Sequence, residues 1–212
     1  MGQNKVIVIS GQPGAGSSTI TKLIAEKLRL DYFIAGRLFK DIALGEASKQ
    51  HYYSLFKQLC NKKNLSIPRF HAKNDEEATR LVWNSPLGKN PAFHSVIDDL
   101  QIELAKKGNI VIDGKLSVRM IKKASIKIWL TASFKARAER HAYKNNISFE
   151  EASRLLEMRQ EQERVEWQRI YGFDYWDQEL EADLVIDTSN KNPPEIVNEI
   201  LASVAKPKGL PV

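Results

Sequence analysis

The stretch GQPGAGSST, residues 11–19, has the residue types and spacing of a loop that binds phosphate groups. It follows the pattern GxxxxGK(S/T), in which glycines let backbone N–H groups turn inward around the phosphates and the next helix directs its positive end at them. The lysine position, however, holds Ser17, which supplies a hydroxyl but no charge. The sequence therefore predicts either a phosphate site without its usual cation or only a tight strand–helix turn. The predicted site comprises Gly11, Gly14, Ala15, Gly16, Ser17, Ser18 and Thr19.

A carboxylate that could work beside this loop ends the apolar run NIVIDG, residues 109–114. Asp113 stands where a Walker-B acid would follow a buried strand and hold Mg²⁺ or its water. The hydroxyl of Ser18 is the other predicted ligand of Mg²⁺. An Asp before a Gly is also common in turns, so Asp113 alone leaves both interpretations open. Taken together, Ser18 and Asp113 favour a metal site.

These groups need strands that end at one edge of a sheet, and the chain has the pattern for such a sheet. Short apolar runs rich in Val and Ile are candidate strands, at residues 5–10, 32–35, 109–113, 126–130 and 183–187. Runs without polar alternation suit strands that are buried on both faces of a parallel sheet. Helical patterns begin near Ser17, Arg37, Ala92, Ser117, Ser133, Ser148 and Pro193. This alternation predicts a doubly wound α/β domain, with residues 60–92 as loops around short helices.

Composition sets the class of protein in which such a domain would occur. The chain has 212 residues, of which 42% are apolar and 27% charged, as in an ordinary globular protein. No apolar run approaches the roughly 20 residues of a membrane helix, and residues 1–10 are interpreted as leading into a first strand. The single cysteine, Cys60, excludes an internal disulfide and fits a reducing compartment. We therefore expect a cytoplasmic protein with no membrane partner.

Residues 45–91 carry most of the net charge of +6, because they contain eight Lys or Arg residues and four acids. Aromatic residues are interleaved with these charges, at Tyr52, Tyr53, Phe56, Phe70 and Trp83. Basic and aromatic residues together are compatible with a nucleic-acid surface. The favoured interpretation is a mobile subdomain with a core of aromatic residues and solvated lysines.

Longer stretches of the chain resemble the archaeal-type cytidylate kinases, a branch of the nucleoside-monophosphate kinases. They are GQPGAGSSTITKLIAEKLRLDYFIAGRLFKDIA, NPAFHSVIDDLQIELAKKGNIVIDGKL, IKIWLTASFKARAER, RIYGFD and DLVIDTSNKNPPEIV. That family characteristically has a hydroxyl residue where other phosphate loops have lysine, so Ser17 fits it. The resemblance implies a P-loop NTPase fold with a five-stranded parallel sheet flanked by helices. It also implies ATP as phosphoryl donor, Mg²⁺ as cofactor, and a monomer that binds small-molecule nucleotides.

The resemblance implies three parts within one P-loop kinase domain, residues 1–212. The CORE would comprise approximately residues 1–44, 92–145 and 171–212, the NMP-binding subdomain residues 45–91, and the lid residues 146–170. The match is poorest between about Gly45 and Asn90, where this chain is longer.

At the acceptor site the family's residues carry over unevenly. Lys40 stands where the family has an arginine that grips the acceptor phosphate, and Lys115 replaces the arginine of its EGR or DGR motif. A lysine keeps the charge but loses the bidentate fork. Arg37 is a possible substitute, or an exposed residue in the first turn of a helix, and Leu100 replaces a further arginine. The predicted substrate-binding residues are Arg37, Lys40, Asp98, Gln101 and Lys115.

The predicted lid offers cations that could replace the missing lysine. Its sequence RLLEMRQEQERVEWQR contains Arg154, Arg159, Arg164 and Arg169. Arg159 and Arg164 fall at or near family lid positions and are the predicted catalytic cations, together with Asp113. The alternative is a solvated helix in which Arg159 pairs with Glu163 four residues on. Arg137 and Arg140 are the next candidates.

These features predict ATP-dependent phosphoryl transfer to a nucleoside monophosphate, with CMP or dCMP as the acceptor. Two alternatives stay open. One is a kinase of the same fold that acts on AMP or a small alcohol, and the other is a non-catalytic nucleotide- or RNA-binding module.

Overall fold

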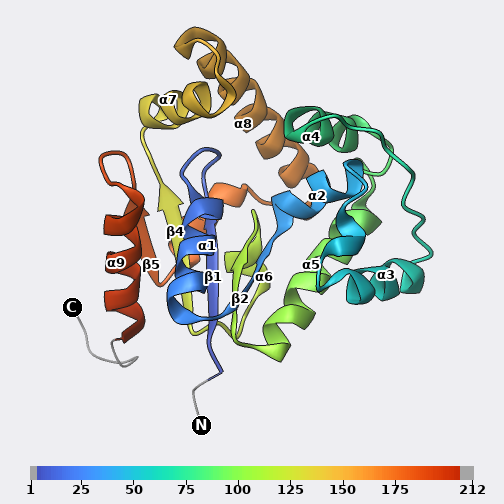
Figure 1. Cartoon of the computed structure of the whole chain (residues 1–212), viewed down its shortest axis with the longest axis horizontal. Coiled ribbons are helices and arrows are strands. Elements are labelled where there is room, and N and C mark those ends of the chain that lie inside the picture. Colours follow the sequence, from blue (N-terminus) through green and yellow to red (C-terminus); the bar gives the residue numbers. More distant parts are fainter. Residues whose placement is uncertain (1–3, 206–212) are drawn as a thin grey trace.

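A single parallel sheet forms the centre of the protein (Figure 1). The computed structural model describes residues 4–205, so the outermost parts of the predicted CORE, residues 1–3 and 206–212, lie outside the described residues. The strands are β1 (Val6–Gly11), β2 (Asp31–Ile34), β3 (Ile110–Asp113), β4 (Ile126–Thr131) and β5 (Leu184–Asp187). They are ordered β2-β3-β1-β4-β5. This confirms the predicted α/β fold with five parallel strands.

The strand order brings the two predicted phosphate-site groups together. β1 lies between β3 and β4, and its Ile9 pairs with Asp113 at the end of β3. The loop that follows β1 therefore begins beside Asp113. This is the carboxyl edge of the sheet, where open α/β folds bind their ligands.

Alternate residues of β1 face two different hydrophobic clusters, which explains why its sequence shows no polar alternation. Val6 and Val8 belong to a cluster with residues of α5 (Pro91–Lys107). Ile7 and Ile9 belong to a cluster with residues of α1 (Ser17–Leu28) and α9 (Pro193–Ala205). Helices thus cover both faces of the sheet, as expected for parallel strands.

The helix starts predicted from the sequence agree with the structure within a few residues. Ser133 and Ser148 cap α7 (Phe134–Asn145) and α8 (Phe149–Tyr171), because each hydroxyl accepts a hydrogen bond from the backbone N–H three residues on. The short helix α6 (Ser117–Met120) follows the turn after β3.

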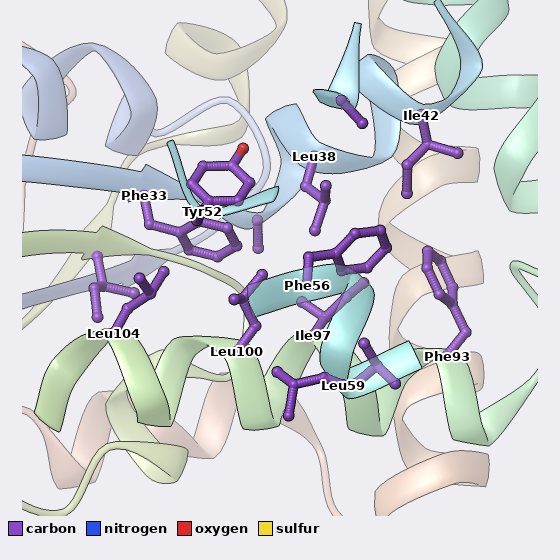
Figure 2. Close-up of a cluster of buried hydrophobic side chains, with 14 of the residues drawn as sticks. Phe33, Leu38, Ile42, Tyr52, Phe56, Leu59, Phe93, Ile97, Leu100 and Leu104 are labelled. Atoms are coloured by element: carbon purple, nitrogen blue, oxygen red, sulfur yellow. The ribbon is translucent and has the colours of Figure 1, made fainter. Parts of the chain in front are cut away.

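Residues 45–91 share a hydrophobic core with the sheet. Their helices α3 (Tyr53–Lys62) and α4 (Asp75–Asn84), with a 3-10 turn at Ala47–Lys49, pack beside α5 and α2 (Ala35–Ala43). Tyr52 is buried against Phe33 of β2, and Phe56 is buried in the same hydrophobic cluster (Figure 2). Rings that are buried in this way cannot stack on nucleobases, whereas basic side chains such as Lys57 and Lys62 are exposed. The interpretation of these two aromatic residues as core is thus confirmed, while the division into subdomains stays a prediction.

Helices α7 and α8 form a hairpin over the end of the sheet from which the β1–α1 loop projects (Figure 1). The C-terminal half of α8 reaches α4 and α5, where Trp167 makes edge-to-face contacts with Trp83 and His94. Tyr175 continues this cluster into the 3-10 helix η2 (Tyr175–Glu181). Within residues 4–205, no helix is long and apolar enough to cross a membrane.

Candidate active site

The backbone of the phosphate loop, residues 11–16, has the conformation that its glycines predict. Gly14 and Gly16 adopt left-handed φ angles of 85° and 98°. A Cβ atom on Gly16 would meet nothing within 4 Å, so open space lies on that side of the backbone. Gly16 is also the residue that precedes α1, whose first N–H groups lack partners within the helix. The loop therefore presents backbone donors and a positive helix end at one place.

Ser18 and Asp113 meet beside this loop. The Ser18 hydroxyl donates a hydrogen bond of 2.7 Å to the carboxylate of Asp113, which is buried. Burial raises the pKa of Asp113, although hydrogen bonds from Ser18 and Ser17 partly counteract this effect. A hydroxyl and a carboxylate are the hard oxygen ligands that Mg²⁺ prefers.

Those two oxygens suit a cation that also binds nucleotide phosphates. Among the described residues, no group of three or more His, Cys, Asp or Glu side chains could hold a metal ion. Mg²⁺ is commonly bound by one or two protein oxygens together with substrate phosphates. Ser18 and Asp113 fit this mode, in which the nucleotide supplies further ligands.

Outward-facing carbonyl groups of the phosphate loop are held by side-chain donors from other elements. The hydrogen bonds are Lys115 to Gly11 O (3.4 Å), Arg137 to Pro13 O (3.2 Å), Arg140 to Gly14 O (3.5 Å) and Thr188 to Ala15 O (3.0 Å). Arg137 is 4% exposed and bonds to a second carbonyl at Ala132. It therefore supports the loop from behind instead of facing a bound phosphate.

Two of the predicted cations converge on this site through a buried acid. Glu163 of α8 pairs with Arg159 at 2.8 Å and with Lys115 at 3.1 Å. The Glu163 side chain is 8% exposed, whereas that of Arg159 is 50% exposed. Burial would raise the pKa of Glu163, but the charges of Lys115 and Arg159 outweigh it and lower that pKa to about 2. The predicted i,i+4 pair of Arg159 and Glu163 thus exists, and Glu163 is shared with Lys115.

The other predicted catalytic arginine lies apart from this group. Arg164 forms an ion pair with Asp174 and lies over the ring of Trp176 at 5.1 Å. It follows Arg159 by five residues, so the two side chains leave α8 in different directions. Arg159, and not Arg164, is therefore linked to the phosphate loop, through Glu163 and Lys115.

On the acceptor side, two basic residues of α2 share one acid. Asp75, the first residue of α4, accepts from Arg37 at 3.1 Å and from Lys40 at 2.9 Å. Arg37 is also paired with Asp41 and Glu46. The hydrogen bond from Lys40 holds the pKa of Asp75 below its usual range. Arg37 and Lys40 are therefore close together, and their charges are largely balanced by acids of the same chain.

The two predicted acceptor residues of α5 have partners within the protein. Asp98 accepts a hydrogen bond of 2.5 Å from the hydroxyl of Tyr171, and burial raises its pKa to about 6. Gln101 is buried and accepts from the hydroxyl of Ser117, just after the Asp113 turn. These contacts support the surrounding structure, and they do not connect either side chain to the phosphate loop.

A cavity of about 290 Å³ lies next to Arg37, between α1, β2, α2 and residues 50–52. Its lining residues are Lys22, Leu30, Asp31, Tyr32, Ile34, Arg37, Gln50, His51 and Tyr52. Only Arg37 among them belongs to the predicted substrate site. The chemistry-bearing groups around Asp113 are therefore a better guide to the active site than this hollow.

Comparison with known proteins agrees with this geometry. The profile of the cytidylate kinase-like family matches residues 6–190, which include the phosphate loop, Asp113, Lys115 and the residues of α8. The chain belongs to that family. A cytidylate kinase of Pyrococcus horikoshii is 33% identical over 94% of this chain and 88% of its own length. That of Methanocaldococcus jannaschii is 30% identical over 94% of this chain and 97% of its own length.

Solved structures show that the cytidylate kinase-like chain shares its fold with other proteins. Shikimate kinase from Acinetobacter baumannii, in complex with shikimate, has a TM-score of 0.53 and 13% identity over 95% of this chain and 93% of its own. An uncharacterized protein from Eubacterium ventriosum has a TM-score of 0.57 and 13% identity over 96% and 99%. These similarities concern the fold alone. Membership of the cytidylate kinase-like family supports nucleotide kinase activity.

Two acids of the candidate site, Glu163 and Asp75, were not predicted as functional from the sequence. Glu163 was considered only as a solvated partner of Arg159, and its burial depends on Lys115, 48 positions earlier in the chain. Asp75 was counted only as a charge. Its position after Asn74, which caps α4, was a usable signal for a helix start but not for a contact with α2.

Proposed function

We propose that the protein transfers the γ-phosphoryl group of ATP to a nucleoside monophosphate, with CMP or dCMP as the preferred acceptor. The observation that carries this proposal is the convergence of the phosphate loop, the Ser18–Asp113 pair and the Lys115–Glu163–Arg159 group. The relatives named cytidylate kinase support the choice of acceptor.

In this proposal the loop backbone binds the phosphates of ATP through inward N–H groups and the start of α1. Ser18 and Asp113 would hold Mg²⁺, which neutralises charge on the phosphate oxygens when bound. Asp113 is buried and its carboxylate already contacts Ser18, so both oxygen ligands are positioned before the nucleotide arrives. Such preorganisation stabilises developing charge with little rearrangement.

Lys115 and Arg159 would together supply the charge that Ser17 lacks. The ammonium of Lys115 has three donors, of which the carbonyl of Gly11 and the carboxylate of Glu163 account for two. Arg159 uses its Nε for Glu163 and is half exposed, so its terminal N–H groups remain for a phosphate. Glu163 would hold both cations beside the transferred group, because it pairs with each of them.

Arg37 and Lys40 would hold the phosphate of the acceptor. They lie on the same helix and share Asp75, so an acceptor phosphate would compete with that acid for their N–H groups. A lysine binds phosphate as a point charge, which orients the acceptor less strictly than an arginine fork. We therefore expect acceptor selectivity that is modest among pyrimidine monophosphates.

A coupled assay for ADP tests the proposal with MgATP and a panel of CMP, dCMP, UMP, AMP, GMP and glycerol. The largest kcat/KM is expected for CMP or dCMP. A higher value for AMP or glycerol would contradict the acceptor assignment, and no turnover with any acceptor would contradict the activity.

The Asp113→Asn variant is the matched test of the metal site. Because a Mg²⁺ ligand matters most as the phosphoryl group leaves, this variant is expected to lose roughly 10²-fold in kcat with little change in the Kd of ATP. Calorimetry measures the Kd. Wild-type kcat in Asp113→Asn would make the residue part of a turn only.

A further inference from the structure

Two residues on one face of α8 reach the phosphate loop through cations of the core. Gln160 accepts a hydrogen bond of 3.1 Å from Nη1 of Arg137, and the same nitrogen donates to the carbonyl of Pro13 at 3.2 Å. Glu163 pairs with Lys115, which also donates to the carbonyl of Gly11. Gln160 and Glu163 are three residues apart, so both lie on the side of the helix that faces the loop.

We propose that Gln160 is a positioning residue, which fixes the shape of the phosphate loop from α8 through Arg137. The inference rests on the proposed nucleotide site, and it assigns to α8 a role in binding ATP in addition to supplying Arg159.

The planar peptide bond explains how a contact behind the loop acts in front of it. In a trans peptide the C=O and the following N–H point in opposite directions. A hydrogen bond that holds the Pro13 carbonyl outward therefore turns the N–H of Gly14 inward. Thr188 has the same relation to the Ala15 carbonyl and the N–H of Gly16. These inward N–H groups are the donors that a phosphate needs.

Arg137 is suited to transmit the position of α8 because its guanidinium has little freedom. Its Nε donates to the carbonyl of Ala132 at 3.1 Å, and only 4% of the residue is exposed. Its Cβ also lies where a side chain on Gly14 would clash, which keeps the loop close to it. Gln160 completes this set of partners from α8, so its loss leaves one N–H of Nη1 without an acceptor in a buried place.

The test uses the full-length protein and three single variants. Gln160→Leu removes the acceptor at nearly constant volume, Gln160→Glu keeps an acceptor oxygen, and Gln162→Leu is the control, because Gln162 is an exposed residue of the same helix. The Kd of ATP is measured by calorimetry with Mg²⁺ and without an acceptor, and the Tm is measured alongside.

Gln160→Leu is expected to weaken ATP binding about fivefold, as for the loss of one hydrogen bond. Gln160→Glu and Gln162→Leu are expected to bind like the wild type and to keep its Tm, whereas Gln160→Leu lowers the Tm by a few degrees because a buried N–H group of Arg137 loses its acceptor. The inference is overturned if Gln160→Leu binds ATP as tightly as Gln162→Leu.

A double variant separates positioning from general damage to α8. If Gln160 acts through Arg137, then Gln160→Leu has no further effect on the Kd of ATP in an Arg137→Met background, because methionine has no N–H group to donate to Gln160. Additive effects would overturn the inference. Because these measurements need no acceptor, ATP binding without turnover would sink the proposed function alone, whereas a wild type that binds no ATP would sink both.

Discussion

The phosphate loop and the predicted acceptor side of the candidate site use different chemical groups, backbone in the first and long side chains in the second. At the loop, the proposed phosphate donors are backbone N–H groups, and each outward carbonyl between Pro13 and Ala15 is held by a residue of another element. On the acceptor side, the long side chains of Arg37 and Lys40 depend on one shared acid, Asp75. The phosphate loop is therefore fixed by the fold before a ligand binds. Arg37 and Lys40, in contrast, can exchange Asp75 for an acceptor phosphate when it binds.

This difference predicts that the largest loss will come from a change in the loop backbone. Gly16→Val is expected to abolish measurable ATP binding, because valine strains the φ of 98° and places a branched side chain where the phosphates approach. Gly45→Val is the matched control, since Gly45 also has a positive φ, 71°, and open space around it. Calorimetry with MgATP compares the two. If both variants bind equally well, the loop is only a turn.

The second-largest loss is expected from a change of Arg159, the cation of the predicted lid. Arg159→Ala is expected to reduce kcat on the order of 10³-fold, the lower range for an arginine that stabilises a transferred phosphoryl group, with a smaller effect on the Kd of ATP. Arg164→Ala should have a much smaller effect, because Arg164 is paired with Asp174. Single-turnover kinetics measure both variants. A larger loss in Arg164→Ala would return the catalytic role to that residue.

Glu163, the buried acid that pairs with Lys115 and Arg159, gives the stability of the fold a dependence on pH. The pKa of Glu163 is lowered to about 2, so its pairing stabilises the fold fully above the ordinary pKa of glutamate and is lost as the pH falls toward 2. We expect Glu163→Gln to be less stable than the wild type by roughly 2 kcal/mol at pH 7.

Urea unfolding at pH 7, 4 and 3 measures the difference between Glu163→Gln and the wild type. It should shrink as the pH falls. Gln162→Glu, an exposed change on the same helix, should show no such trend. A difference that grows with acidity would mean that Lys115 and Arg159 do not stabilise the ionised carboxylate.

The smallest expected effect tests the acceptor side. Lys40→Arg restores a bidentate donor and is expected to lower the KM for CMP about threefold, with the KM for ATP unchanged. Lys57→Arg, on the exposed surface of α3, is the control. Steady-state kinetics with CMP as the varied substrate provide the measurement. An unchanged KM for CMP would contradict the assignment of Lys40 to the acceptor phosphate.

The contrast between the two regions also explains which features the sequence predicts well. Glycine spacing determines backbone conformation locally, and the apolar runs around Val8 and Ile112 are long enough to mark buried strands. The loop and the sheet could therefore be predicted with nearly correct bounds. The register of Ile9 with Asp113 then places this predicted metal ligand beside the start of the loop that leads to Ser18, the other one.

Contacts between distant side chains could not be predicted in the same way. Arg159 and Arg164 are equally basic and lie on one helix, yet only the packing of α8 decides that Glu163 connects Arg159 to Lys115. Asp98 likewise carries no signal in the sequence for its hydrogen bond with Tyr171, 73 positions later. Such pairs depend on how helices cross, which hydrophobic periodicity does not specify.

The helix α8 is long enough to contact both the surroundings of the phosphate loop and α4, so it can couple the two proposed nucleotide sites. Its 23 residues extend about 35 Å, with Gln160 and Glu163 at the phosphate loop and Trp167 against Trp83 of α4. An acceptor phosphate that binds Arg37 and Lys40 would displace Asp75, the first residue of α4. Because α8 contacts α4 through Trp167, it can pass a resulting shift of α4 to the loop that is proposed to bind ATP. We therefore expect heterotropic coupling, in which the binding of one nucleotide changes the Kd of the other by the same factor in both directions.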